Sequence, residues 1–147
     1  MSDMEIEKEI LAKGKTAPRL TPDHIECVIA EEHYFTAFDG IRAAHEGVRE
    51  VLSVHPSTRS LTICVLVLCN GFIVTGESAC ASPENFDAEI GRKVARKNAI
   101  EKIWPLEGYL LKQKLSEQIQ STVEIVISTL MTLLWQEATK DKQHVCG

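Results

Sequence analysis

The sequence lacks the signatures of a secreted, disulfide-bonded or membrane-spanning protein. Its five cysteines are odd in number and include no C-x-x-C pair, which argues against a disulfide framework and fits a reducing compartment. The first fifteen residues are mostly charged, so no secretory signal is expected. The most apolar run, residues 123–135, contains polar residues and is shorter than a membrane span. We therefore expect a soluble protein of the cytoplasm.

Catalytic and metal-binding motifs are also missing. The sequence has no G-x-S-x-G nucleophile motif, no H-E-x-x-H or H-x-x-x-H metal motif, and no obvious pair of acids. The formal net charge of −5 argues against general affinity for DNA or for an anionic membrane, because either needs a broad basic surface. These absences favour a protein that is not an enzyme and uses no cofactor. A nuclease or hydrolase remains an open third class, with no residues to assign to it.

The clearest structural signal is an apolar hairpin. Residues 61–69 are almost wholly apolar and predict a strand with neither face suited to water. Asn70-Gly71 predicts a tight turn with positive φ at both positions, and residues 72–75 predict the return strand. Because a lone hairpin is marginally stable, we expect helices on one side and another subunit on the other side or at the edge. The fold class is α+β, with a β-hairpin-based antiparallel sheet packed by helices.

Three helices are predicted around this hairpin. A short helix over residues 1–13 is followed by a linker over 14–20, and Thr21-Pro22 starts a second helix that extends to about Glu32. Asp39-Gly40 is expected to turn the chain, after an aromatic stretch over residues 33–38 that either packs on the core or stacks a base. Ser82-Pro83 starts a third helix, which we expect to kink or break at Trp104-Pro105. Its predicted buried side consists of Phe86, Ile90, Val94, Ala95, Ala99 and Ile103.

The C-terminal part predicts an assembly helix. Apolar residues from Leu115 to Leu133 step by 4, 4, 3, 4 and 3, which is close to a heptad repeat. Further apolar positions widen this stripe, so we expect a helix buried between subunits and a homo-oligomer. The predicted organisation is an N-terminal helix and linker over residues 1–20, an α+β core over 21–115, and an oligomerisation helix with a frayed tail over 116–147.

Positive charge in this acidic chain is concentrated on the third predicted helix. Five basic residues and one acid lie between positions 92 and 102. Arg92 and Arg96 are one helical turn apart and share a face, so their guanidinium groups can bind neighbouring phosphate oxygens. The alternative is a solvated helix face whose charges pair with acids elsewhere. Converging side chains in a cleft would favour the first interpretation, and side chains fanned into solvent would favour the second.

Two long stretches resemble a known family. S-A-C-A-S-P-E-N-F-D at residues 78–87 and I-W-P-L-E-G-Y-L at 103–110 are similar to the core segment of a widespread family of small bacteriophage and prophage proteins. The resemblance covers roughly residues 61–115 and, more weakly, 20–44. That family includes the anti-defence sponges that counter the Thoeris immune system. The resemblance implies an oligomer, described as a hexamer, that holds cyclic ADP-ribose isomers at subunit interfaces without catalysis. It also implies that some members hold cyclic oligonucleotides at a separate site.

Residue types in the core suggest a ligand site for such a molecule. Phe72 or Phe86 could stack on adenine, and Asn85 could bind the base edge or the ribose. Arg92, Arg96 and Lys102 could bind the pyrophosphate. The expected function is sequestration of a cyclic nucleotide signal, with the nucleotide and further copies of the chain as partners. The alternative is an oligomeric scaffold or protein-interaction module of a phage or prophage, without a small-molecule ligand.

Overall fold

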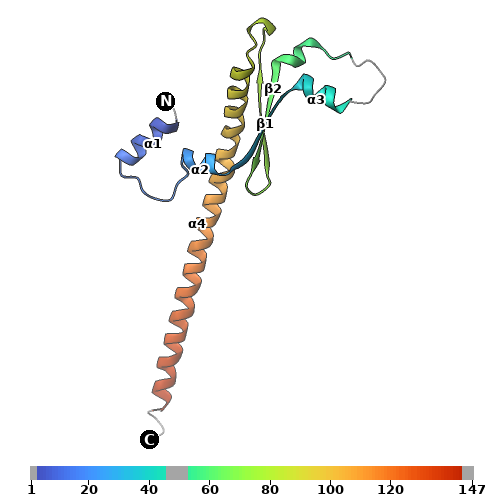
Figure 1. Cartoon of the computed structure of the whole chain (residues 1–147). Coiled ribbons are helices and arrows are strands. Elements are labelled where there is room, and N and C mark those ends of the chain that lie inside the picture. The colour runs from blue at the N-terminus through green and yellow to red at the C-terminus, as the bar shows by residue number, and fades with distance from the viewer. Residues whose placement is uncertain (1–2, 46–52, 144–147) are drawn as a thin grey trace. The chain divides into compact units, whose positions relative to one another are not determined.

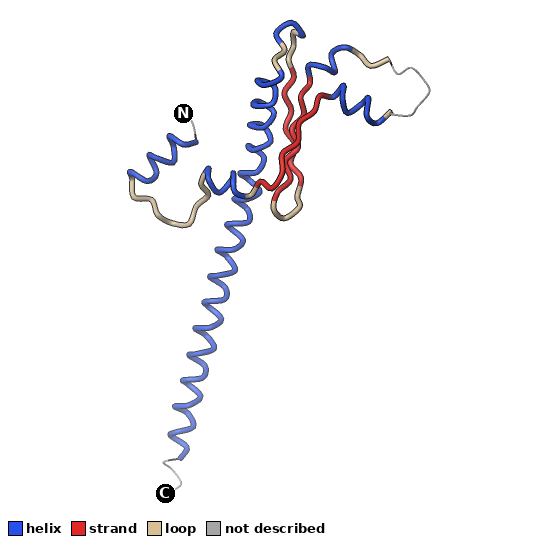
Figure 2. Tube along the Cα trace, in the orientation of Figure 1, coloured by secondary structure: helices blue, strands red, loops and turns tan. Residues whose placement is uncertain are grey.

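The computed structural model describes residues 3–45 and 53–143, with side-chain burial described up to residue 137. The chain divides into two units, residues 1–108 and 109–147. The first unit holds three strands, β1 (Ile29–Thr36), β2 (Leu61–Leu68) and β3 (Ile73–Ala79), in one antiparallel sheet of order β1-β2-β3 (Figure 2). A long helix, α4 (Ala88–Gln143), packs its first part against this sheet (Figure 1). The fold class is therefore α+β, as the sequence predicts.

The central strand β2 positions the core. Its side chains alternate between fully buried and half-buried, because α4 covers only one of its faces. Cys64 and Leu66 on the covered face pack against Ala95, Ala99 and Ile103 of α4. This confirms the predicted buried positions on the second half of the helix stripe. The other face of β2 is half-buried, and its predicted cover by a second subunit stays a prediction.

The strand β1 corrects the prediction of a helix that extends to Glu32. Helix α2 (Pro22–Cys27) starts where predicted, with the Thr21 hydroxyl accepting from the backbone N–H of His24 at 3.1 Å. This helix is only six residues long, and the chain after it forms β1, which pairs with β2. β1 is an edge strand, and its middle residues Glu31, Glu32 and His33 are all exposed, on both faces. Three polar residues in a row give no alternation of apolar and polar residues that would indicate a strand.

The hairpin between β2 and β3 forms as predicted, with a different loop. The N–H of Gly71 donates to the carbonyl of Leu68 at 2.8 Å, and the N–H of Leu68 donates to the carbonyl of Phe72 at 2.8 Å. Only Gly71 has a positive φ, of 82°, so the expected positive φ at Asn70 is wrong. This is the geometry of a three-residue loop, in which a single glycine takes the left-handed position.

Helix α4 packs unusually close to β3. A Cβ added to Gly76 would lie 2.1 Å from the carbonyl oxygen of Ala95 and 2.4 Å from the backbone nitrogen of Ala99. Only glycine permits this approach, in line with the general use of glycine inside a strand at a bulge or at a close approach of backbone. Ile90 and Val94, predicted to be buried, are 62% and 41% exposed because they lie on the opposite side of the helix.

Pro105 does not break α4. The helix continues through this position to Gln143, so the predicted break is wrong. Proline removes one backbone hydrogen bond and crowds the preceding turn. The neighbouring residues offset this cost, because Ile103 is fully buried and Trp104 packs against the core.

Two smaller helices complete the first unit. Helix α1 (Asp3–Ala12) occupies the predicted N-terminal position and is followed by Gly14, whose φ is 63°. Helix α3 (Ala37–Ala44) follows β1 directly and contains Asp39 and Gly40, so the turn predicted at these residues is wrong. Short 3₁₀ turns, η1 (Pro56–Ser60) and η2 (Pro83–Asn85), precede β2 and α4. Gly47, which was expected in irregular structure, lies outside the described residues.

Candidate functional site

A pocket of about 300 Å³ lies where the end of β1, the start of β2 and the first turn of α4 meet. We call it the Arg92 pocket. It is lined by Tyr34, Phe35, Thr36, Asp39, Thr62, Phe86, Ala88 and Arg92. These residues come from segments far apart in the sequence, so the fold itself brings them together.

The start of α4 sets one wall of the Arg92 pocket. The predicted cap at Ser82 is wrong, because the Ser82 side chain makes no capping hydrogen bond. The residues that follow Ser82 form only the short turn η2. Asp87 caps the helix instead, with its Oδ1 accepting from the backbone N–H groups of Glu89 and Ile90 at 2.8 and 2.9 Å. Phe86 therefore precedes α4 instead of lying on its buried stripe, and its half-buried ring lines the pocket.

Gly91 lets α4 approach the start of β2. A Cβ at this position would lie 2.7 Å from Oγ1 of Thr62. Thr62 is only 3% exposed, and its hydroxyl has no hydrogen-bond partner among the described residues. An unpaired buried hydroxyl costs free energy, on the order of 1–3 kcal/mol. It marks a place where a bound molecule can supply the missing partner.

The opposite wall is set by the junction of β1 and α3. Thr36 and Asp39 form a capping box, in which the Asp39 N–H donates to the Thr36 hydroxyl at 3.2 Å. Asp39 Oδ2 accepts from the Thr36 hydroxyl at 2.6 Å and from its N–H at 3.1 Å. These bonds hold the pKa of Asp39 below its ordinary value, and the Arg59 and Arg42 charges add to the effect. Asp39 is thus a fixed anion beside the pocket.

Arg92 is the cation of the pocket. Its side chain is exposed and makes no hydrogen bond or ion pair with any residue that the structure describes. An unpaired guanidinium beside a half-buried aromatic ring can bind an anion while the ring stacks on a planar group. Arg92 and Phe86 are two of the six residues expected to bind a ligand, and the structure brings them together in this pocket.

The other four expected ligand residues lie elsewhere. Phe72 is 54% exposed beside the hairpin loop, and Asn85 is exposed in η2. Lys102 donates from Nζ to the carbonyl of Thr75 at 2.7 Å, so it binds the backbone of β3. Arg96 lies one turn after Arg92 and does not line the pocket.

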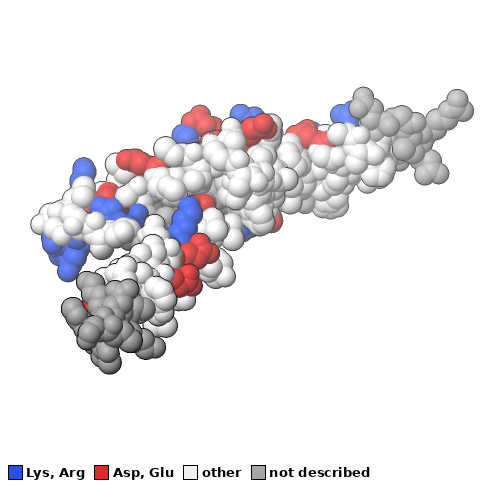
Figure 3. Space-filling view, turned by 90° about the horizontal axis from the view of Figure 1, so that it is seen from below, with Lys and Arg blue, Asp and Glu red and all other residues white. Residues whose placement is uncertain are grey.

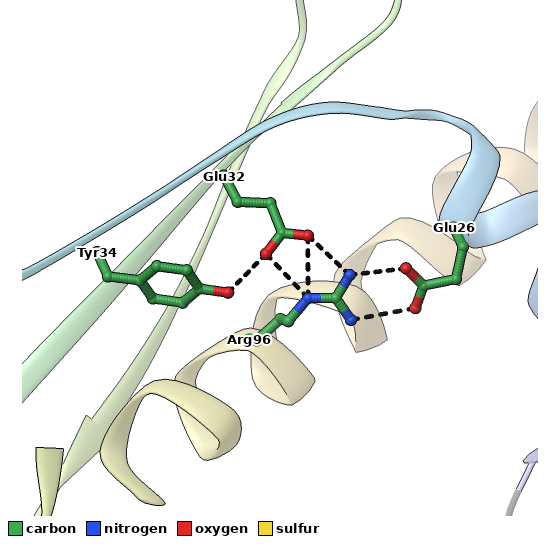
Figure 4. Close-up of polar contacts among 4 residues, drawn as sticks. All are labelled: Glu26, Glu32, Tyr34 and Arg96. Atoms are coloured by element: carbon green, nitrogen blue, oxygen red, sulfur yellow. Dashed lines mark hydrogen bonds and ion pairs between the residues drawn. The ribbon is translucent and has the colours of Figure 1, made fainter. Parts of the chain in front are cut away.

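Arg96 instead links α4 to β1 and α2. Its guanidinium donates to both carboxylate oxygens of Glu26, at 2.6 and 3.1 Å, and to those of Glu32, at 2.8 to 3.2 Å (Figure 4). The Tyr34 hydroxyl donates to the same Glu32 carboxylate at 2.6 Å. The fork that was expected to bind phosphate is thus occupied by two acids of the chain itself.

The charges of this cluster shift one another's pKa values. Hydrogen bonds from Arg96 lower the pKa of Glu32, although burial opposes the shift. Hydrogen bonds to Glu26 and then Glu32 raise the pKa of Arg96. Burial, followed by the bond to Glu32, raises the pKa of Tyr34. At neutral pH, Glu32 is therefore ionised, Arg96 is charged and Tyr34 is neutral. We call this cluster, which links α4 to α2 and β1, the clamp.

The two lysines next to Arg92 and Arg96 in the sequence are paired locally. Lys93 and Lys97 each face an acid four residues away, with Lys93 2.6 Å from Glu89 and Lys97 3.9 Å from Glu101. Both pairs are well exposed, as expected for a solvated helix surface. On the face drawn in Figure 3, basic and acidic side chains are interspersed among uncharged ones.

Sequence reasoning missed most of the Arg92 pocket. Thr62 was a visible signal, since it is a polar residue near the start of an otherwise apolar run. The T-x-x-D spacing of Thr36 and Asp39 was another, because it is the sequence pattern of a capping box. Tyr34 and Phe35 belong to the aromatic stretch over residues 33–38, which was expected to pack on the core or to stack a base, and both line the pocket. Their proximity to Arg92 depends on the pairing of β1 with β2, which places Thr36 opposite Thr62.

Two kinds of feature are absent from the described part of the chain. Within residues 3–45 and 53–143, no three His, Cys, Asp or Glu side chains are grouped so that they could hold a metal ion. None of the helices described there combines the length and hydropathy needed to cross a bilayer. The four cysteines that the structure describes, Cys27, Cys64, Cys69 and Cys80, are free thiols.

Comparisons with known proteins identify the family. Curated proteins and solved structures give no significant match to this sequence. A family model does match, over residues 20–115, a segment that contains α2, the whole sheet and the start of α4. The match thus includes every residue of the Arg92 pocket. Because it covers well over half of the chain, the protein belongs to the Phage protein (N4 Gp49/phage Sf6 gene 66) family.

Proposed function

We propose that this phage-family protein binds a cyclic nucleotide signal, a cyclic ADP-ribose isomer or a related cyclic oligonucleotide, and sequesters it without chemical change. The observation that carries the proposal is the Arg92 pocket. There, an unpaired guanidinium, an aromatic ring and a buried hydroxyl without a partner face one small space. Sequestration from a host immune effector is the role implied by the resemblance of residues 78–87 and 103–110 to the Thoeris sponges.

Each group in the pocket suits one part of such a ligand. Arg92 binds a phosphate oxygen through a charge-assisted hydrogen bond. Phe86 offers a half-buried ring on which adenine can stack. The Thr62 hydroxyl gains the partner that it lacks. Asp39 has one oxygen engaged by Thr36, and its other oxygen can accept from a ribose hydroxyl. The carboxylate also repels phosphate, so it orients the ligand with its anionic part toward Arg92.

The size of the Arg92 pocket favours a site shared between subunits. A volume of about 300 Å³ lies at the lower end of the range for small-molecule sites. It accommodates one base with one phosphate, which is part of a cyclic dinucleotide. We propose that a second copy of the chain covers the rest of the ligand, and that the protein leaves the ligand chemically unchanged.

The experiment is a ligand panel followed by recovery. Thermal unfolding of the full chain is measured with cyclic ADP-ribose isomers, cyclic oligonucleotides and adenosine monophosphate as the control. A ligand at a hundredfold excess over its Kd stabilises the folded state by about 2.7 kcal/mol, so a clear rise in Tm is expected. Heat denaturation and chromatography should then return the ligand intact. Linearised ligand accumulating with protein and time would instead show an enzyme.

A second candidate function is supported by a separate observation. Residues 116–137 of α4 are exposed throughout and rich in large apolar side chains, which is typical of a protein-interaction surface. In this alternative the protein is an oligomeric scaffold, and the Arg92 pocket holds no nucleotide. The ligand panel separates the two functions, since a scaffold shows no Tm shift with any nucleotide.

A further inference from the structure

The segment of α4 from residue 116 to 137 differs from the rest of the described chain in its surface. Every side chain in this tail segment is exposed, and they include Ile119 at 65% and Trp135 at 70% exposed. Its charged residues are Glu117, Glu124 and Glu137 alone. Most helical stability in proteins comes from packing of an apolar face. In aqueous solution, the tail segment therefore needs a partner that covers its apolar side chains.

The spacing of its apolar residues identifies the kind of partner. Ile119, Val123, Val126, Leu130 and Leu133 step by four, three, four and three, which defines a continuous heptad seam. Such a seam winds into a left-handed supercoil with helices that carry the same repeat. The tail segment of another copy carries the same repeat in the same register. From Ile119 to Leu133 the seam carries no charge, and the next position of the repeat, Glu137, lies at its end, so identical copies meet over this stretch without burying an unpaired charge.

The polar residues of the tail segment follow the same repeat on the far side. Ser121 and Ser128 are seven residues apart and lie opposite the seam, while Glu117 and Glu124 are also seven apart and lie outside it. Glu117 and Glu124 accept hydrogen bonds from Gln113 and Gln120, each four residues earlier, on the surface of their own helix. This polar repeat covers two heptads, and Met131 and Trp135 occupy the same positions in the third, where the apolar surface extends around the helix.

The width of the apolar surface indicates how many helices associate. Ile127 and Leu134 lie seven residues apart and directly beside the seam, so the apolar surface extends beyond the positions that a pair of helices buries. β-Branched residues occupy both kinds of seam position, with Val123 at one and Ile119 and Val126 at the other. This pattern favours three or four helices over two. We propose that the tail segments of at least three copies of this chain pack together as a helical bundle.

This assembly lies outside the family-matched residues 20–115, so it is a property of this chain's own tail. It is independent of ligand binding. A bundle would hold several Arg92 pockets in one particle, but its formation requires no nucleotide. Failure of one proposal therefore leaves the other intact.

The test compares two aspartate variants of the full chain by light scattering after size-exclusion chromatography. At low micromolar concentration, the wild type should have the mass of at least three chains. Val126→Asp places a charge in the seam and should lower the mass to a fraction of the wild-type value. Ser128→Asp adds the same charge on the opposite side and should leave the mass unchanged. Leu130→Asn is a milder seam variant for the case in which the aspartate variant is insoluble.

Helix content provides the second measurement. Circular dichroism of the wild type should show loss of helix on dilution, in parallel with loss of mass, because the bundle stabilises the tail by mass action. The Val126→Asp variant should already show the reduced helix content. A wild-type mass of one or two chains would overturn the proposal, as would a mass that the seam variants do not change. Capture of a host protein by a monomeric chain would favour the scaffold function in its place.

Discussion

Replacement of Arg96 tests whether the clamp described above stabilises the fold. From sequence alone, an exposed helical arginine would contribute little to folding, and Arg96→Ala would alter only ligand binding. The structure contradicts this premise. The Arg96 side chain is 29% exposed and pairs with Glu26 of α2 and Glu32 of β1, which precede it by 70 and 64 residues. We therefore predict that Arg96→Ala destabilises the first unit.

The magnitude follows from the exposure of the partners. A hydrogen bond to a charged group contributes roughly 1.5–3 kcal/mol when it is shielded from water, and an exposed ion pair about 0.2–1 kcal/mol. Glu26 is 53% exposed, so its pair lies near the lower figure. Glu32 is 34% exposed and would keep only the Tyr34 hydroxyl as a partner. A sum of about 2 kcal/mol is expected after this discount for solvent, since alanine itself favours the helix.

The assay is thermal unfolding of the full chain with two comparison variants. A loss of about 2 kcal/mol should lower the Tm by roughly 8 °C for a unit of this size. Lys93→Ala removes a cation from the same helix that pairs only with Glu89, and it should lower the Tm by at most about 2 °C. Arg96→Lys keeps the charge without the fork and should fall between the two. A Tm for Arg96→Ala equal to that of Lys93→Ala would refute the clamp.

Further predictions concern packing, capping and pH. Gly76→Ala should destabilise the protein by about 3 kcal/mol or more, because the new Cβ would lie 2.1 Å from a backbone oxygen of α4. Gly108→Ala should instead add about 0.5–1 kcal/mol of stability, because its Cβ would meet only a side chain at 3.9 Å. Urea unfolding measures both changes. In the same assay, Asp87→Ala should cost about 1 kcal/mol through loss of the α4 cap, and Ser82→Ala should cost nothing measurable. Because the pKa of Glu32 is lowered from its ordinary value of 4.5, its ion pair stabilises the fold fully only at a pH above 4.5. The difference in unfolding free energy between wild type and Arg96→Ala should therefore shrink as the pH falls below that value. A difference that stays constant with pH would exclude Glu32 as the partner that matters.

The parts of the fold predicted from the sequence are those with strong local signals. The apolar run of β2 and the glycine turn after it need no tertiary information, and neither does the Thr21 cap of α2. Gly76 inside a strand indicates either a bulge or a close backbone approach, and the structure shows the close approach. These features are determined within a few residues of the chain.

The parts that were missed depend on competition between distant segments. Strand β1 carries Glu31, Glu32 and His33 in a row, which is possible because it lies at the edge of the sheet. Two competing caps precede α4, and the choice of Asp87 over Ser82 shifts the helix start by five residues. The predicted ligand residues were chosen by chemistry on one helix. Arg92 and Arg96 are equivalent in that pattern, and only the tertiary positions of Glu26 and Glu32 distinguish the paired from the unpaired guanidinium.

Titration calorimetry with a cyclic ADP-ribose isomer tests the proposed site most directly. The wild-type chain should bind it, and Arg92→Ala should weaken binding by about ten- to a hundredfold, the loss of one charge-assisted hydrogen bond to phosphate. Lys97→Ala is the matched control, since Lys97 lies on the same helix outside the Arg92 pocket, and it should bind as the wild type does. Equal affinity of Arg92→Ala and wild type, or the absence of binding heat with any cyclic nucleotide, would contradict the proposed site.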